Sequence, residues 1–267
     1  MDNVKYVNAK HFLTPTGLGT DYACNPYVGC MHGCIYCYAK FVSDYQKREE
    51  PWGTFVDIKE YPNYDILRSN GDKSVIFSSV TDAYQPIEKT ERRTRKILEN
   101  IYESRLQVRF LTKSDLILRD LDLLTQMQSI EIGFSIALDD ETAKIMEPNA
   151  ALPSKRIAAL KTIHAAKIST FVFIAPIFPK ITDVFAIIAM VKDHCDYIMF
   201  DSLNLKHAEN KANVFKFIST SYPELLPLYQ NIFEKRDNSY YRNLAVLIRE
   251  YANTFNLDLR IVFPESR

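Results

Sequence analysis

Short apolar runs recur through the middle of the chain. They are rich in β-branched and aromatic residues, and several are apolar at consecutive positions, as strands buried on both faces of a sheet are. The pattern predicts a strand at each run, and a further strand near residues 22–28. The runs cover residues 74–78, 107–111, 130–135, 171–174 and 197–200.

Helical periodicity fills the segments between these strands. Between residues 92 and 102, and again between residues 157 and 168, apolar side chains recur on one face of a helix and polar side chains on the other. Strict alternation of strand and helix favours a parallel sheet with right-handed crossovers. About six such strand–helix units predict the α/β class, as a partial (βα)6 TIM-like barrel.

The last part of the chain extends this core. Nothing between residues 195 and 210 has the composition of a flexible linker. We therefore expect a single domain, with a core of about residues 20–205 and a C-terminal extension of about residues 206–267. Within the extension the pattern predicts helices near residues 212–236 and 240–255 and a last strand near residues 257–263.

Composition narrows the classes of partner. The chain is 47% hydrophobic, and its 33 Lys and Arg residues balance 33 Asp and Glu residues. A net charge of zero disfavours a nucleic-acid partner bound through bulk electrostatics. No apolar run approaches the ~18 residues of a membrane span, and the N-terminus lacks the apolar segment of a signal peptide. The five cysteines do not suggest a disulfide framework, so we expect a cytoplasmic protein.

Three cysteines are clustered on one short segment. Cys30, Cys34 and Cys37 have the spacing C-x3-C-x2-C. A structural zinc site takes four protein ligands, and Cys24 or His32 could supply the fourth. Alternatively, three thiolates can hold three irons of a [4Fe–4S] cluster and leave the fourth iron open to a small molecule. The spacing by itself leaves both kinds of site open.

The residues around the cysteines give a narrower indication. Residues 25–40 read N-P-Y-V-G-C-M-H-G-C-I-Y-C-Y-A-K. This string resembles the radical S-adenosylmethionine (SAM) superfamily, and within it the spore photoproduct lyase-like branch related to DNA repair photolyases. The resemblance implies a [4Fe–4S] cluster on the three cysteines, SAM as cofactor, and an electron donor such as flavodoxin or ferredoxin. In this superfamily the reduced cluster cleaves SAM to a 5′-deoxyadenosyl radical, which takes a hydrogen atom from the substrate.

The resemblance also implies contacts to SAM at the strand ends. Hydroxyls after residues 74–78 stand where the superfamily has a Gly-Gly-Glu segment and would face the SAM amino group. For the SAM carboxylate, Arg156 is preferred to Lys113 because a guanidinium can donate two parallel hydrogen bonds. The fourth strand would meet the ribose or carboxylate, and the fifth strand, ended by two prolines, would meet adenine beneath Tyr36. The implied cofactor residues are Tyr36, Ser78, Ser79, Thr81, Lys113, Ser135, Arg156, Ala175 and Pro176.

Plainer interpretations remain open for several of these residues. Thr81 or Asp82 could cap a helix, and Lys113 and Arg156 could be solvated cations. Outside the set, we expect Asp183 as a helix cap, His164, Cys24 and Cys195 as packing residues, and Asp201, Asn204 and Lys206 as contacts to adenine or substrate.

A missing thiol constrains the reaction. Spore photoproduct lyase uses an additional cysteine as hydrogen donor near the end of its second strand, and residues 78–82 contain no cysteine. Repair of a thymine dimer in duplex DNA is therefore disfavoured. The chain also has no second cysteine cluster, which excludes activities that need an auxiliary cluster. No residue is assigned as the hydrogen donor or acceptor.

The segment after the cysteines bears on the substrate. Tyr45, Trp52, Phe55 and Tyr61 could stack on a planar base or simply pack over the barrel. We predict a lyase that breaks a C–C or C–N bond of a nucleobase-like small molecule, as in salvage of queuine, a 7-deazaguanine. One rival is a radical SAM enzyme acting on DNA or RNA, which would use the basic run at residues 92–96. The other rival is a non-enzymatic zinc or iron–sulfur module.

Overall fold

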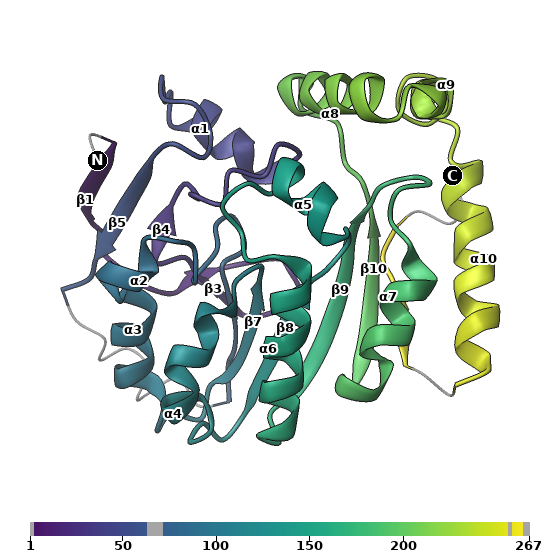
Figure 1. Cartoon of the computed structure of the whole chain (residues 1–267). Helices are drawn as coiled ribbons and strands as arrows, with labels where there is room; N and C mark the ends of the chain where they lie inside the picture. Colours follow the sequence, from purple (N-terminus) through teal and green to yellow (C-terminus); the bar gives the residue numbers. More distant parts are fainter. Residues whose placement is uncertain (1–2, 63–71, 256–257, 264–267) are drawn as a thin grey trace.

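A parallel sheet forms the centre of the molecule, whose computed structural model describes residues 3–62, 72–255 and 258–263. Its strand order is β11-β10-β9-β8-β7-β6-β3-β2, and each neighbouring pair from β3 to β11 is parallel. The predicted α/β class and partial barrel are confirmed (Figure 1). The strands are β2 Thr14–Pro15, β3 Tyr22–Cys24, β6 Ser74–Phe77, β7 Gln107–Thr112, β8 Ile130–Ser135, β9 Ser169–Ile177, β10 Tyr197–Ser202 and β11 Leu259–Ile261.

Helices cover the outer face of this sheet. Figure 1 shows α3, α4, α6 and α7 beside the strands that they connect. Helix α3 buries Ile97, Leu98 and Ile101, the apolar face that the periodicity predicts there. The helices up to β10 are α1 Phe41–Tyr45, α2 Glu88–Glu91, α3 Arg93–Ile101, α4 Leu121–Leu124, α5 Asp140–Met146, α6 Pro153–Ala165 and α7 Val184–Val191, with 3-10 turns at Tyr38–Lys40, Asp115–Asp120 and Lys192–His194.

The alternation of side chains along the strands positions the polar residues. Phe77, Phe110, Phe134 and Phe200 are each at most 1% exposed and join one core cluster with the outer helices. Because successive side chains point to opposite faces of a sheet, inward positions follow these residues at the carboxyl ends of the strands. The inward polar residues are Ser78, Lys113, Ser135 and Asp201.

A stacked layer fills the amino half of the concave face. Gly133 has no room for a side chain, since a Cβ there would lie 2.1 Å from Cζ of Phe171. The Phe171 ring stacks on Tyr197 with centroids 5.1 Å apart, and the Arg260 guanidinium lies 3.5 Å from the Tyr197 centroid. Since this layer occupies the amino half of the barrel interior, the space for a ligand is at the carboxyl ends of the strands, where barrel enzymes bind substrates.

A second, smaller sheet departs from the prediction. The strand expected near residues 22–28 is two strands, because β3 joins the main sheet while β4 Tyr27–Val28 pairs antiparallel with β5 Val56–Glu60. Pro26 lies between them and has no amide hydrogen with which to continue a ladder. Strand β1 Val4–Asn8 completes this sheet beside β5, and the apolar pattern predicts neither β1 nor β5.

Strand β9 runs further than its prolines predict. It continues past the predicted run at residues 171–174 and through Pro176 to Ile177, so the expectation that Pro176 blocks the strand is wrong. Phe200 pairs with Ile174 but Ser202 pairs with Ile177, which leaves one extra residue in β9 as a β-bulge. A bulge tolerates proline because the bulged residue leaves the ladder.

The C-terminal extension packs over the site and along the sheet edge. Helix α8 Ala208–Ser221 and helix α9 Leu226–Phe233 are separated by a 3-10 turn at Pro223–Leu225, so the helix predicted over residues 212–236 is interrupted. Helix α10 Ser239–Asn253 follows, and residue 257 of the predicted last strand lies outside the described residues. Across residues 3–62, 72–255 and 258–263, no helix combines the length and apolarity needed to span a membrane.

Candidate active site

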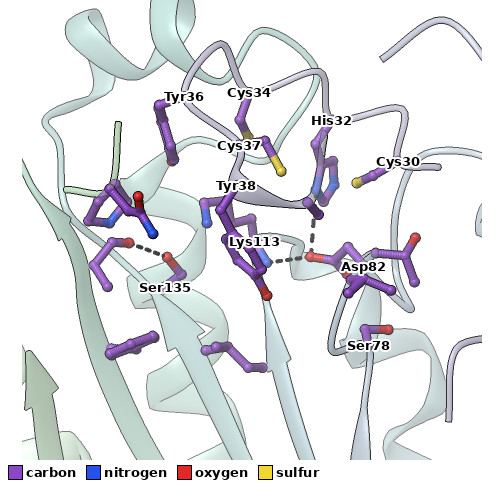
Figure 2. Close-up of a pocket in the computed structure, with 18 of the residues that line it drawn as sticks. Cys30, His32, Cys34, Tyr36, Cys37, Tyr38, Ser78, Asp82, Lys113 and Ser135 are labelled. Atoms are coloured by element: carbon purple, nitrogen blue, oxygen red, sulfur yellow. Dashed lines mark hydrogen bonds and ion pairs between the residues drawn. The ribbon is translucent and has the colours of Figure 1, made fainter. Parts of the chain in front are cut away.

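A cavity of about 350 Å³ lies at the carboxyl ends of the strands, beneath residues 30–37, which we call the cysteine loop. Figure 2 shows the three cysteines on this loop facing Asp82 and Lys113, with Ser78 and Ser135 at neighbouring strand ends. The structure brings together Tyr36, Ser78, Thr81, Lys113, Ser135, Ala175 and Pro176 in the cavity lining, and leaves Ser79 and Arg156 outside it.

Glycines let the cysteine loop fold tightly over the cavity. Gly29 and Gly33 have φ of 84° and 63°, in the left-handed region that favours glycine. A Cβ on Gly29 would lie 2.6 Å from the carbonyl oxygen of Phe55. The amide of Cys37 donates to the carbonyl of Cys34 at 3.1 Å, which closes the last turn of the loop.

Two helices hold the cysteine loop from outside. At the end of α5, the Met146 carbonyl accepts a hydrogen bond from the Ile35 amide at 3.0 Å, and the Asn149 side chain donates to the Met31 carbonyl at 2.9 Å. From α8, the buried amide of Asn210 donates to the Cys37 carbonyl at 2.7 Å. The C-terminal extension is therefore part of the site, which sequence reasoning missed because Asn210 carries no motif.

The thiols lie in an environment that disfavours free thiolates. Burial raises the pKa of Cys30, Cys34 and Cys37, and the positive charge of Lys113 opposes this increase at Cys34 and Cys37. Thiolates in such a site need a bound cation to stabilise them. Three clustered thiols whose pKa values stay raised despite the nearby cations therefore fit a metal cluster.

The candidate fourth zinc ligands are directed elsewhere. Cys24 is fully buried in the main core cluster, and His32 Nδ1 lies 3.5 Å from a carboxylate oxygen of Asp82. Among the described residues, no three His, Cys, Asp or Glu side chains stand close enough to share a single metal ion. A [4Fe–4S] cluster does not need that arrangement, since each cysteine binds its own iron.

The hydroxyls after β6 have different roles. Ser78 Oγ is buried in the cavity wall without a hydrogen-bond partner in the described part of the chain, and Ser78 has a left-handed φ of 68°. Thr81 Oγ1 donates to the Gly29 carbonyl, and Ser79 Oγ accepts from Asn25 at 3.1 Å. Of the three hydroxyls after β6, Ser78 Oγ is thus the one that forms no hydrogen bond with the described residues.

Asp82 organises the strand ends. Its carboxylate accepts hydrogen bonds from Thr112 Oγ1 at 2.8 Å, from the Lys113 amide at 2.9 Å and from the Tyr84 amide at 2.8 Å. It therefore joins the end of β6 to the end of β7 and fixes the backbone of Lys113. With these bonds filled, Asp82 is better suited to position Lys113 than to receive an ammonium group.

The two predicted carboxylate ligands separate in the structure. Lys113 lines the cavity and forms no ion pair within the described residues. Arg156 is 1% exposed and donates to the Glu147 carboxylate, to the Ser135 carbonyl at 2.9 Å and to the Ala151 carbonyl at 2.7 Å. Its guanidinium is occupied inside the protein, so Lys113 replaces Arg156 as our candidate for the SAM carboxylate.

Glu147 is a buried carboxylate that the sequence did not assign to the site. It accepts hydrogen bonds from the Tyr36 hydroxyl and from Arg156. Burial alone would raise the pKa of Glu147, but the charges of Arg156 and Lys113 hold it below its usual value. Glu147 is therefore ionised, and it fixes Tyr36 in the cavity wall.

Further residues line the cavity, some predicted to contact adenine or substrate and others without a predicted role. Asp201, near the end of β10, and Asn204, just after it, line the cavity, and burial raises the pKa of Asp201. Tyr38 and Trp52 also line it, and the Tyr38 hydroxyl donates to the Ser79 carbonyl. Tyr38 directly follows the last cysteine, a position that could have flagged it from the sequence.

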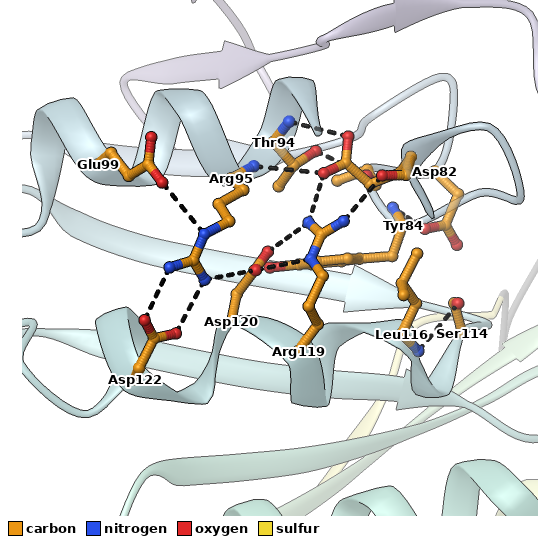
Figure 3. A network of polar contacts seen from close by, with 12 residues as sticks. Asp82, Tyr84, Thr94, Arg95, Glu99, Ser114, Leu116, Arg119, Asp120 and Asp122 are labelled. Atoms are coloured by element: carbon orange, nitrogen blue, oxygen red, sulfur yellow. Dashed lines mark hydrogen bonds and ion pairs between the residues drawn. The ribbon is translucent and has the colours of Figure 1, made fainter. Parts of the chain in front are cut away.

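Two of the four cations in the basic run at residues 92–96 form ion pairs with described residues. Arg95 pairs with Glu99, Asp120 and Asp122, as Figure 3 shows, and Arg93 pairs with Glu60. None of these arginines lines the cavity. This surface provides less free positive charge for a nucleic acid than the sequence suggests.

Other expectations can be compared with their positions. Phe55 is fully buried and Tyr61 hydrogen-bonds to the Asn25 carbonyl, so of the four aromatic residues only Trp52 faces the cavity. Asp183 caps α7, as expected. Of the expected packing residues, Cys195 is buried, and His164 Nδ1 lies 3.1 Å from Thr170 Oγ1. Lys206, expected to contact adenine or substrate, is outside the cavity lining.

Fold and site together define an α/β barrel-type protein with a three-cysteine cluster loop over its strand ends. The sequence model of the Radical SAM superfamily matches residues 24–186, more than half of the chain, so the protein belongs to this superfamily. Its members are enzymes that use a [4Fe–4S] cluster and SAM, and this protein uses both. Ser78 Oγ without a hydrogen bond to the described residues, Lys113 without an ion pair to them, and the three clustered thiols fit these groups.

Two curated relatives are similar to this chain in sequence. The chain is 39% identical over 228 residues to an uncharacterized protein of Methanocaldococcus jannaschii, covering 84% of this chain and 86% of the relative. It is 31% identical over 178 residues to an uncharacterized protein of the Acidianus two-tailed virus, covering 61% of this chain and 58% of the relative. Neither relative adds a reaction.

Solved structures agree with the fold. Spore photoproduct lyase complexed with dinucleoside spore photoproduct aligns with a TM-score of 0.69 and 16% identity, over 98% of this chain and 82% of that one. Streptococcus suis SuiB bound to SAM aligns with a TM-score of 0.57 and 12% identity, over 91% of this chain and 49% of that one. At such low identity, these similarities establish the fold alone.

Proposed function

We propose that this protein is a radical SAM lyase acting on a nucleobase-like small molecule, with queuine as the concrete candidate. The observation that carries the proposal is that the cavity beneath the cysteine loop also contains the carboxylate of Asp201, which forms no ion pair among the described residues. A volume of about 350 Å³ is in the range of small-molecule sites.

The chain's own residues would bind and orient the cofactor. When bound, the cluster and SAM supply one-electron cleavage of SAM to methionine and a 5′-deoxyadenosyl radical that takes a hydrogen atom from the substrate. Ser78 Oγ would accept a hydrogen bond from the SAM ammonium group, and Lys113 would pair with its carboxylate. Tyr36 and the backbone at Ala175 would enclose the adenine ring and exclude water from it.

Asp201 suggests the chemical class of the substrate. A guanine-type base presents two adjacent N–H donors on one edge, and a carboxylate can accept both in parallel. Asp201 Oδ1 already accepts from the Ser202 amide at 2.7 Å, which orients the side chain. The ring of Trp52 and the amide of Asn204 lie in the same cavity lining and would complete a site for a planar polar base.

The rival substrate is a DNA photoproduct. The similarity to spore photoproduct lyase supports it, whereas the ion pairs of Arg93 and Arg95 and the zero net charge favour the small molecule. Salt separates the two, because DNA binding releases counterions and weakens steeply as salt rises. Binding of a neutral base depends little on salt.

The test begins with anaerobic reconstitution of the cluster. We expect a brown protein that releases 5′-deoxyadenosine from SAM with dithionite, and faster release when the correct substrate is present. Queuine, other 7-deazaguanines and dinucleoside spore photoproduct should be compared, with products identified by mass. Turnover of the dinucleoside alone would contradict the small-molecule substrate, and a colourless zinc protein without SAM cleavage would contradict the radical chemistry.

Two variants separate cofactor and substrate roles. Cys34→Ala should lose the cluster and all SAM cleavage, since three thiolates are needed to hold the cubane. Asp201→Asn should keep SAM cleavage without substrate but raise KM for a guanine-type base at least tenfold, because hydrogen bonds from the base to a charged carboxylate are lost. An unchanged KM would exclude Asp201 as the base-reading residue.

A further inference from the structure

A continuous buried hydrogen-bond chain connects two opposite walls of the cavity. It starts at Tyr36 on the cysteine loop, where the hydroxyl donates to the Glu147 carboxylate. Arg156 donates to the other Glu147 oxygen and to the Ser135 carbonyl at 2.9 Å. Ser135 Oγ then donates to the Ala175 carbonyl at 2.8 Å.

The side chains of this hydrogen-bond chain are buried. Tyr36 is 6% exposed, Glu147 is 3% exposed and Arg156 is 1% exposed. A buried ion pair of this kind adds little net stability compared with apolar residues, but removal of one partner leaves an uncompensated charge. Its presence is therefore better explained by a requirement for geometry than by a requirement for stability.

The geometry concerns the position of the Tyr36 ring. The ring packs edge-on against Phe178 with centroids 5.2 Å apart, and Lys113 Nζ lies 5.8 Å from the ring centroid. Glu147 directly follows α5 and Arg156 lies on α6, so two rigid helices determine where the hydroxyl can bond. The opposite wall, at Ser135 and Ala175, is held by the same Arg156.

We propose that Glu147 and Arg156 are positioning residues that set the separation between Tyr36 and the ends of β8 and β9, and so select the adenosine part of SAM. They touch neither the cluster nor the ligand and act through Tyr36 and Ser135. The inference rests on SAM binding in this cavity, as in the proposed function. Arg156 is buried and its guanidinium is already hydrogen-bonded, so a direct contact with the SAM carboxylate does not explain it. A positioning role does.

The test compares two ligands on the loaded protein. SAM fills both the amino-acid and the adenosine parts of the cavity, whereas methionine fills only the first. Glu147→Gln and Tyr36→Phe should weaken SAM binding about tenfold and methionine binding less than twofold, since one charge-assisted hydrogen bond is lost at the adenosine side. Fluorescence of Trp52, the single tryptophan and a cavity residue, reports both affinities.

The cluster content of the variants, and the non-additivity of the Tyr36 and Glu147 substitutions, distinguish a positioning role from a general loss of structure. Without ligand, the iron content and the electron paramagnetic resonance signal of the variants should match those of the wild type. The change in that signal on addition of SAM should be smaller in the variants. The double variant of Tyr36 and Glu147 should be no worse than the poorer single variant, because both break the same chain. Glu141→Gln, at an exposed glutamate on α5, is the matched control.

Several outcomes would overturn the inference. They are wild-type SAM affinity in Glu147→Gln, an equal loss of methionine affinity, or additive effects in the double variant. If the single variants fail to fold, Glu147→Leu combined with Arg156→Met removes the charges together, and wild-type discrimination between SAM and methionine in that variant would also overturn it. A wild-type protein that binds SAM but does not cleave it would contradict the proposed function alone.

Discussion

Lys113 brings a positive charge into the cavity without an acidic partner among the described residues. Its backbone is fixed by the bond from its amide to Asp82, so the side chain leaves the strand end in a defined direction. Its positive charge acts to lower the pKa of Cys34, Cys37 and Glu147. A ligand carboxylate at this point would gain a charged hydrogen bond and relieve the unpaired cation.

Replacement of Lys113 by Met tests this role. We expect the Kd for SAM to rise roughly 10–100-fold, because a hydrogen bond to a charged group contributes about 1.5–3 kcal/mol. Equilibrium dialysis on cluster-loaded protein measures the change. Lys161→Met, at an exposed position of α6, is the control, and equal affinities for SAM in the two variants would sink the assignment.

Gly133 is a second position where a single residue decides the local structure. Gly133→Ala should lower the free energy of unfolding by about 1–3 kcal/mol, because the new Cβ overlaps the Phe171 ring. Denaturant unfolding of the variant and the wild type measures this difference in free energy. Gly17→Ala is the control, since no atom lies within 4 Å of the Cβ it would add, and it should change stability by less than about 0.5 kcal/mol.

At the scale of elements, helix α5 links the cap at its start to the buried Glu147 at its end. Asp139 caps the helix by accepting hydrogen bonds from the Thr142 amide at 2.9 Å and from the Thr142 hydroxyl at 2.8 Å. Although partial burial would raise the pKa of Asp139, these bonds hold it below its usual value near 3.8. The cap thus contributes stability above that value and loses it as the pH falls through the lower pKa of the folded state.

Asp139→Asn isolates this titration, because asparagine caps a helix about as well but carries no charge. The free energy of unfolding of the cluster-free protein should fall less steeply below about pH 4 in the variant than in the wild type. Urea unfolding at a series of pH values measures the two slopes. Parallel curves would mean that Asp139 has the same pKa in both states.

At the scale of the whole molecule, the C-terminal extension and the cysteine loop share one core. Cys34 and Tyr36 of the loop belong to the same apolar cluster as Val214 and Ile218 of α8. Because ligands of a metal site must be held together by the folded chain, cluster retention depends on this packing. The α8 helix is thus part of the cofactor site although it lies far from the motif in sequence.

Ile218→Val measures this coupling. The loss of one buried methylene should lower the free energy of unfolding by about 1 kcal/mol and speed cluster loss to a chelator several-fold. Val246→Ala, at a side chain 52% exposed on α10, should change neither by much. An Ile218→Val protein that loses stability but keeps the wild-type rate of cluster loss would show that the extension and the loop are not coupled.

The sequence by itself determined the elements that local physics controls. Apolar runs predicted strands β6 to β10, and helical periodicity predicted α3 and α6. The clustered cysteines defined the loop, and the resemblance of residues 25–40 to the radical SAM superfamily implied its cofactors. The sequence also placed Ser78, Lys113 and Ser135 near the carboxyl ends of strands, which meet at one edge of a parallel sheet.

Only the tertiary structure decided which side chains are free for ligands. Arg156 has the chemistry to bind a carboxylate, but Glu147, Ala151 and Ser135 occupy its guanidinium. Ser79 and Thr81 resemble Ser78 in sequence, yet their hydroxyls are already bonded. Hydrogen-bond partners depend on three-dimensional proximity across segments, so no local pattern can report whether a donor or acceptor is still available.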